Sequence, residues 1–240
     1  MNGQVSQIMK MTGAAKRVLK YDEMVEYTPE DYVNSIRFEV KWILGKTKLL
    51  KSFRNWVLHL KKFNYKEIKV YINPDVQEPG LLGFSNTHGS KIILHLLNGK
   101  GIEYRPTWYF DESIGKWNIR YVEENIDDPG IYEDGSTFDI NNFDSLLDEI
   151  SQFASDIGAE YFAEIFSNAR NTLHRNDFPG QYMHIFYAVS ESDVFGAMGS
   201  WNDEPYGRAV EKGLLKEYER LSGALVRENR LGAMYCINNW

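Results

Sequence analysis

The chain has 240 residues, of which 43% are hydrophobic and 25% are charged, and its formal net charge at pH 7 is −7. This is ordinary globular content, and the single cysteine, Cys236, excludes an internal disulfide. No stretch approaches the roughly 18 apolar residues of a membrane-spanning helix. The first 20 residues also lack the apolar core of a signal peptide, so we expect a cytoplasmic protein.

The charge is unevenly distributed along the sequence. Residues 1–70 carry 14 Lys and Arg against 7 Asp and Glu, whereas residues 111–164 carry 2 basic against 15 acidic residues. One interpretation is two solvated faces that happen to differ in charge. The other is an acidic surface kept for a basic partner, which would steer association.

The N-terminal third predicts helices. Residues 1–27 show no clear period and predict a mobile arm or a short helix. Thr28-Pro29-Glu30-Asp31 is typical of a helix start, and apolar residues at helical spacing continue to Gly45. A second apolar stripe runs over residues 49–60, so the two segments predict a helical hairpin. Its surface is basic through Lys41, Lys46, Lys48, Lys51, Arg54, Lys61 and Lys62.

The period then changes from 3.6 to 2, which indicates strands. Four segments fit, and we interpret them as an antiparallel meander: residues 67–72, 91–98, 104–110 and 117–122. These observations place a basic arm and hairpin in residues 1–64 and an α+β domain in residues 65–240, with one continuous domain as the alternative.

The remaining segments predict an acidic loop and long helices. Residues 123–140 contain two turn signals, and a helix follows over residues 142–173, where Gly158 would allow a bend. Residues 182–189 are rich in β-formers and predict a further strand. An apolar helical pattern then runs over residues 214–237, with one break expected at a glycine. The predicted fold class is therefore α+β, an antiparallel meander packed by long helices.

Most catalytic signatures are absent. The sequence lacks paired-histidine metalloprotease, paired-cysteine, phosphate-loop and nucleophile-elbow motifs, so it favours a protein that is not an enzyme and has no cofactor. A hydrolase remains an alternative, and its candidate groups are His88, His95, His184 and the Glu160/Glu164 pair. That pair could join His174 and Asp177 in a metal site, but an exposed acidic helix face is favoured.

Aromatic residues make up 14% of the chain, and three of them fall in polar loops. Tyr132, Trp201 and Tyr206 are each either a structural anchor or a binding residue, because Tyr and Trp are enriched at interfaces.

A nucleic-acid-binding or regulatory protein is a second alternative. The basic residues of the predicted hairpin could neutralise phosphates. Trp42 and Trp56 both fall on the apolar stripes, however, so the pattern does not favour stacking on bases.

The closing residues carry a resemblance. The segments WNDEPY, EKGLLKEYERLS and AMYCINNW follow a predicted meander and long helix in an acidic α+β chain. This combination resembles the bacterial immunity proteins of polymorphic and contact-dependent toxin systems, mainly over residues 139–240. The resemblance implies a cytoplasmic, non-enzymatic protein that neutralises a cognate toxin by binding its active domain.

A polyanionic surface would suit such a partner, because toxin domains that act on nucleic acid present basic surfaces. We expect no membrane partner. The predicted toxin contacts lie in the acidic loop and in the loop at residues 201–206, and they are Glu123, Glu124, Asp127, Asp128, Tyr132, Glu133, Asp134, Trp201, Asp203 and Tyr206.

Overall fold

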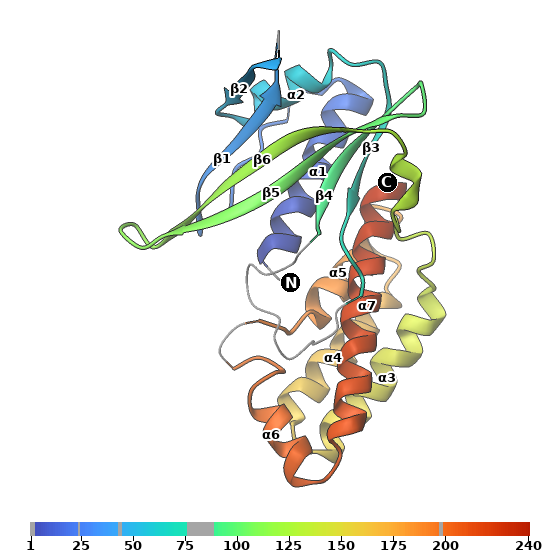
Figure 1. Ribbon diagram of the computed structural model, residues 1–240. Helices are drawn as coiled ribbons and strands as arrows, with labels where there is room; N and C mark the ends of the chain where they lie inside the picture. Colours follow the sequence, from blue (N-terminus) through green and yellow to red (C-terminus); the bar gives the residue numbers. More distant parts are fainter. Residues whose placement is uncertain (1–2, 24, 43–44, 76–88, 197–198) are drawn as a thin grey trace. The chain divides into compact units, whose positions relative to one another are not determined.

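The fold is α+β, as predicted. The computed structural model describes residues 3–23, 25–42, 45–75, 89–196 and 199–240. Within these ranges it contains seven α-helices, one short 3₁₀ helix and one six-stranded sheet (Figure 1). The chain divides into two compact units. One comprises residues 7–71 and 89–132, and we call it the sheet unit; the other comprises residues 1–6, 72–88 and 133–240, and we call it the helical unit. Residues 64 and 65 lie in the same unit.

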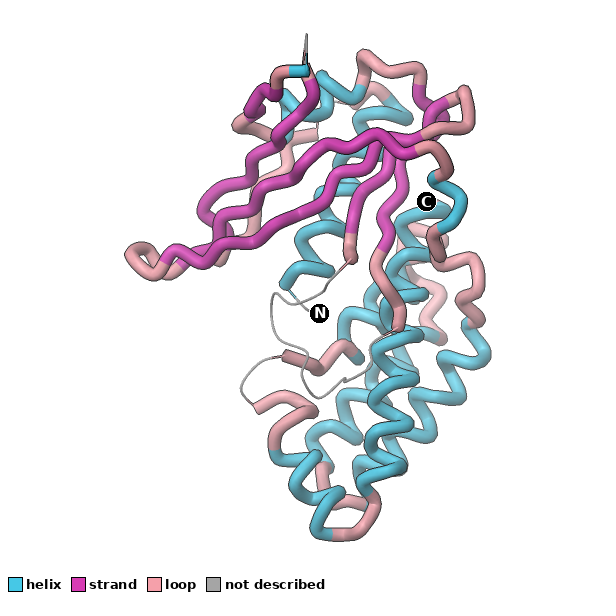
Figure 2. Tube along the Cα trace, in the orientation of Figure 1, coloured by secondary structure: helices cyan, strands magenta, loops and turns pink. Residues whose placement is uncertain are grey.

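The sheet contains all four predicted strands of the meander and two further strands. In chain order the strands are β1 (Val33–Lys41), β2 (Thr47–Leu50), β3 (Tyr65–Tyr71), β4 (Lys91–Leu96), β5 (Gly101–Asp111) and β6 (Lys116–Ile126). Their order in space is β2-β1-β6-β5-β4-β3 (Figure 2). Strands β3 to β6 pair antiparallel in succession, whereas β1 pairs parallel with β6. The sheet is therefore mixed and larger than the predicted meander.

The predicted N-terminal helical hairpin is wrong in its first half. Residues 33–41, expected to be helical, form β1, in which Ile36, Phe38 and Val40 alternate as buried residues. Pairing with β6 along one side and β2 along the other satisfies the backbone of β1, and this outweighs the local helix signal. The second half, predicted over residues 49–60, is helical only from residue 53: α2 (Phe53–Leu60) begins at the Ser52 cap, whereas residues 49 and 50 belong to β2.

Residues 3–21 form a regular helix, α1 (Gly3–Tyr21), where the sequence predicted a mobile arm or a short helix. Most of α1 belongs to the sheet unit. Its Gln7 accepts a 2.7 Å hydrogen bond from the hydroxyl of Tyr121 on β6, while Trp56 of α2 stacks on Phe38 of β1 at 4.6 Å. The core of the sheet unit is thus an aromatic cluster that includes Phe38, Trp56, Tyr104 and Tyr121, all fully buried.

The helical unit contains α3 (Ile140–Asp156), α4 (Glu160–Leu173), α5 (Met183–Ser192), α6 (Glu204–Glu211) and α7 (Leu215–Asn239). The short 3₁₀ helix η3 (Pro129–Ile131) precedes it in the sheet unit. The helix predicted over residues 142–173 is divided at Gly158, whose φ of +79° is readily adopted by glycine and disfavoured for other residues. The closing helix has no break within residues 215–239, because α7 runs through Gly223 and Gly232; Gly213, with a φ of +69°, instead separates α7 from α6.

The strand predicted over residues 182–189 is wrong, because this segment forms α5. Its buried residues, Ile185, Ala188, Val189 and Ser192, recur at intervals of three or four, and α5 packs against α4 and α7. A helix-to-helix environment therefore outweighs the β propensity of the aromatic and β-branched residues. No helix of the described residues is both long and apolar enough to cross a lipid bilayer.

The two units carry opposite charge. The sheet unit contains 19 Lys and Arg against 14 Asp and Glu, a net charge of +5. The helical unit contains 8 against 20, a net charge of −12. The acidity of the whole chain is therefore concentrated in the helical unit.

Candidate functional site

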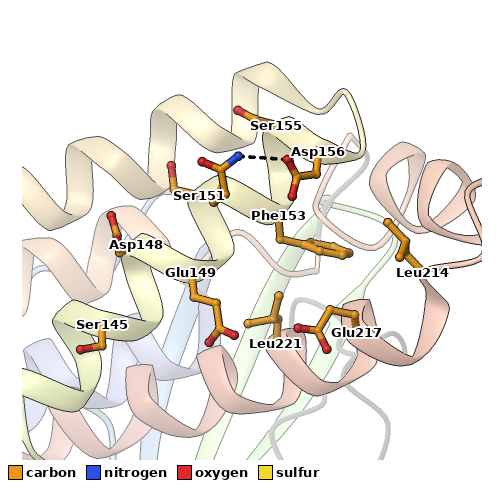
Figure 3. Close-up of a pocket in the computed structure, with 11 residues that line it drawn as sticks. Ser145, Asp148, Glu149, Ser151, Phe153, Ser155, Asp156, Leu214, Glu217 and Leu221 are labelled. Atoms are coloured by element: carbon orange, nitrogen blue, oxygen red, sulfur yellow. Dashed lines mark hydrogen bonds between the residues drawn. The ribbon is translucent and has the colours of Figure 1, made fainter.

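An open groove with an acidic rim lies in the helical unit, along α3 and the start of α7. Its volume is about 640 Å³, within the range of sites that take ligands or side chains of a partner. Phe153 and Leu221 are buried beneath it, and Leu214 is partly exposed at one end. The polar lining comprises Ser145, Asp148, Glu149, Ser151, Gln152, Ser155, Asp156 and Glu217. We call this feature the acidic groove (Figure 3).

The acidic groove follows from the helical periodicity of α3. Residues 139–164 contain seven acidic and no basic residues, and the buried apolar side chains of α3 leave its carboxylates on the solvent side. Figure 3 shows Glu149 and Glu217 projecting from α3 and α7 toward the same space, with Leu221 between them. The groove therefore combines an apolar floor with carboxylates on both walls.

One arginine bridges the two walls. The Arg220 guanidinium pairs with Glu149 and donates a 2.7 Å hydrogen bond to Glu217. The hydrogen bond from Arg220 lowers the pKa of the Glu217 carboxyl, so this group stays ionised in mildly acidic solution. The four lining carboxylates are offset in part by two guanidinium groups, because Arg170 pairs with Asp148 as Arg220 does with Glu149 and Glu217, and the Lys212 ammonium donates to the carbonyl of Asp156. Four negative against three positive charges leave the lining negative by one charge, and cationic side chains could lay their methylene stems on the apolar floor.

The serines of the acidic groove are not arranged as nucleophiles. Ser145 donates to the carbonyl of Asn141, Ser151 to that of Ala163, and Ser155 to the carboxylate of Glu160. The groove lining contains no histidine to act as a general base. An activated serine needs such a base within hydrogen-bond reach, so this arrangement is suited to binding.

The predicted acidic loop has a structural explanation. Asp128 accepts a hydrogen bond from the amide of Gly130, Glu133 from that of Gly135, and Asp134 from that of Ser136. Asp127 is exposed and pairs with Lys100 at 2.8 Å, which lowers the pKa of the Asp127 carboxyl. Short acidic side chains stabilise turns in this way. Much of the acidic composition of the loop is therefore turn chemistry.

Glu123, a predicted toxin contact, is only 4% exposed. Its carboxylate lies 2.7 Å from His59 Nε2 on α2, accepts a 2.7 Å hydrogen bond from the Tyr104 hydroxyl, and accepts the backbone N–H of Lys41 at 3.2 Å. Burial, together with this carboxylate, raises the pKa of Tyr104. Glu123 is thus an internal anchor of the sheet unit, whereas its neighbour Glu124 is exposed.

Tyr132 also packs within the sheet unit. Its ring lies 5.4 Å from that of Tyr71, and the Lys91 ammonium lies 3.9 Å from its centroid. Lys91 in turn pairs with the fully buried Glu103 at 3.5 Å. Tyr132 therefore shields a buried ion pair, and it is half-buried itself.

Trp201, the other predicted aromatic contact, is fully buried. Its indole N–H donates to Ser222 at 2.8 Å, and its ring stacks on Tyr218 at 5.4 Å. Trp201 is thus a core anchor and not part of an exposed surface. Asp203 and Tyr206, predicted beside it, are exposed. Asp203 accepts the backbone N–H of Ser200 at 3.0 Å.

Two of the three candidate catalytic histidines, His95 and His184, lie in different units. His88 lies outside the described residues, and His95 Nε2 contacts the Tyr71 hydroxyl at 2.9 Å in the sheet unit. His184 lies on α5 in the helical unit. The hydrolase alternative thus gains no histidine cluster among the described residues.

The proposed metal ligands are engaged elsewhere. His174 pairs with Asp144 at 2.6 Å, and Asp177 pairs with Arg175 at 2.7 Å. Among the described residues, no group of three or more His, Cys, Asp and Glu side chains is placed to hold a metal ion. Glu160 and Glu164 are exposed on α4, which agrees with the acidic-face interpretation.

The acidic walls of the groove were not among the predicted contacts. The acidic run of α3 was visible in the sequence as part of residues 111–164, and helical spacing would have placed its carboxylates on one face. Glu217 had no such signal, because it reaches the groove only through the packing of α7 on α3.

Comparisons with known proteins add no family. No protein-family model matches the chain, and no similar protein is found among the curated proteins or the solved structures. The resemblance of residues 139–240 to immunity proteins therefore stays a hypothesis that rests on the residues quoted above.

Proposed function

We propose that the protein is a non-enzymatic immunity protein that binds and neutralises a cognate toxin domain through an acidic surface. The observation that carries the proposal is the acidic groove in a unit of net charge −12. A toxin that acts on nucleic acid presents cationic side chains, and a polyanionic surface attracts these over long range. The cytoplasmic location follows from the same proposal, since the toxin would be met inside the cell.

The groove is a better contact surface than the acidic loop. Its carboxylates surround an apolar floor, so a lysine or arginine of the toxin would bury its stem and pair its head group. In the acidic loop, by contrast, three carboxylates accept hydrogen bonds from backbone N–H groups and so stabilise turns: those of Asp128, Glu133 and Asp134. Asp203 and Tyr206 of the helical unit remain candidates for the edge of the contact, and Glu124 and Asp127 of the sheet unit remain separate candidates, because all four are exposed.

The test is a charge reversal in the groove against a matched reversal elsewhere. Asp156→Lys with Glu217→Lys changes both walls of the groove. Glu164→Lys with Glu191→Lys changes the net charge equally at exposed sites on α4 and α5. The partner to be tried is any toxin domain that a neighbouring gene encodes, and the measurement is its association rate at several salt concentrations.

We expect the groove variant to associate at least about tenfold more slowly at low salt and to depend less on salt, since steering by charge is lost. The α4 and α5 variant should change far less. Equal rates for the groove variant and the unaltered protein, or equal losses in both variants, would remove the groove as the binding surface.

A further inference from the structure

The sheet unit carries a strongly basic edge that the toxin proposal does not use. Residues 41–62 contain seven Lys and Arg and no Asp or Glu. They include the end of β1, the edge strand β2 and helix α2 (Figure 1). Among the described residues, Lys61 is the member of this run that forms an ion pair, with Asp22. Six exposed cations remain: Lys41, Lys46, Lys48, Lys51, Arg54 and Lys62.

Trp42 stands within this basic edge and is 40% exposed. The Lys48 and Lys62 ammonium groups lie 4.3 Å and 5.3 Å from the centre of its indole ring. Its backbone N–H donates to the carbonyl of Lys46 at 2.7 Å, which holds the backbone of Trp42 beside that of Lys46. The sequence pattern predicted Trp42 on a buried helical stripe. Trp42 instead follows the end of β1, and its partly exposed indole ring lies beside two ammonium groups.

From this geometry we infer that the basic edge binds single-stranded nucleic acid, with a base stacked on Trp42 and the adjoining phosphates paired with Lys48 and Lys62. Proteins that bind single-stranded nucleic acid without sequence preference stack its bases on aromatic rings and pair its phosphates with a row of cations. Six of the seven basic residues are lysines, which act as point charges and do not read bases through paired hydrogen bonds. The binding is therefore independent of sequence.

A single strand fits this edge better than a duplex, because the bases of a duplex are stacked on each other and cannot reach Trp42. A membrane surface fits less well. Leu49 is exposed on β2, on the face away from the buried Leu50, and it pairs with Glu39 of β1. Leu58 is exposed on a different element, α2. Leu49 and Leu58 thus do not add to one apolar patch around Trp42 that could enter a bilayer.

The test uses fluorescein-labelled oligothymidylate of 20 nucleotides and anisotropy titrations of the full chain from 20 to 200 mM salt. We expect binding, and we expect the logarithm of the association constant to fall linearly with the logarithm of the salt concentration. The slope should be about −2 to −3, which corresponds to three or four neutralised phosphates. Trp42→Ala should weaken binding by at least about fivefold, since one stacked base contributes at least that much. Trp42→Phe should retain most of the affinity.

The charged variant Lys48→Glu with Lys62→Glu should abolish binding, and Lys116→Glu with Lys216→Glu is its matched control at exposed sites outside the basic edge. Circular dichroism checks that each variant is folded. Absence of binding, a Trp42→Ala variant that binds as tightly as the unaltered protein, or equal losses in both charge variants would overturn the inference. So would tighter binding to a 20-base-pair duplex or to phosphatidylserine vesicles than to the oligonucleotide. None of these outcomes depends on a toxin, so the two proposals fail separately.

Discussion

Replacement of Glu123 by alanine should destabilise the sheet unit strongly. The change removes a buried carboxylate that lies 2.7 Å from both His59 and Tyr104 and also accepts the backbone N–H of Lys41. A buried polar group left without its partner costs about 1–3 kcal/mol. Because His59, the Tyr104 hydroxyl and the Lys41 amide all lose this partner, we expect a loss of about 4–5 kcal/mol. This is a large part of the 5–15 kcal/mol that stabilises a typical domain.

The assay is urea unfolding at pH 7, followed by circular dichroism. Glu124→Ala is the matched control, because it removes the same group from the adjacent, exposed position and should change the free energy of unfolding by about 0.5 kcal/mol or less. Glu123→Gln keeps an acceptor and should fall between the two, which provides a measurement if the alanine variant does not fold. A loss below about 1 kcal/mol for Glu123→Ala, or equal losses at both positions, would refute the anchoring role of Glu123.

Three further predictions concern the helical unit and pH. Trp201→Ala should lower the free energy of unfolding by about 3–5 kcal/mol, whereas Tyr206→Ala on the exposed side should cost about 1 kcal/mol or less; urea unfolding of both separates a core residue from a surface residue. Cys236 is buried, which raises the pKa of its thiol, so a thiol reagent at pH 8 should modify it only in denaturant, and rapid labelling of native protein would contradict this. Burial lowers the pKa of Lys16 to about 8, below its usual 10.5. The unfolded chain then binds more protons, so stability should rise from about pH 8 to 10, and Lys16→Met should flatten that rise in urea unfolding.

The strands of the meander could be predicted from the sequence because their period is regular, whereas β1 could not. The register of β1 against β6 shifts between Val33 and Ser35, so the next buried residue is Ile36, three positions after Val33. That spacing, continued by Val40, imitates a helix. A bulge of this kind depends on the partner strand and leaves no separate mark in the local sequence.

The contents of the candidate site were visible in part. The acidic run of α3 could be read from composition, but the sequence does not show which acids are exposed. Glu123 and Glu124 are adjacent and chemically alike. Because successive side chains of a strand point to opposite faces, β6 places Glu123 in the core and Glu124 in solvent. Trp201 likewise lies in a polar loop sequence and is buried because Phe162 and Phe166 of α4 and Tyr218 of α7 pack around its ring.

The opposite charges of the two units make the two proposals separable in one molecule. Under the two proposals a basic toxin would be drawn to the acidic groove and a polyanion to the edge that carries Trp42, so each pair of charge reversals should affect one ligand only. Asp156→Lys with Glu217→Lys should leave oligonucleotide affinity unchanged or slightly higher, since it makes the chain less negative. Lys48→Glu with Lys62→Glu should leave toxin association unchanged or faster. If either double variant weakened the binding of both ligands, the assignment of two separate sites would be wrong, and the variant would have altered one shared surface or the folding of the chain.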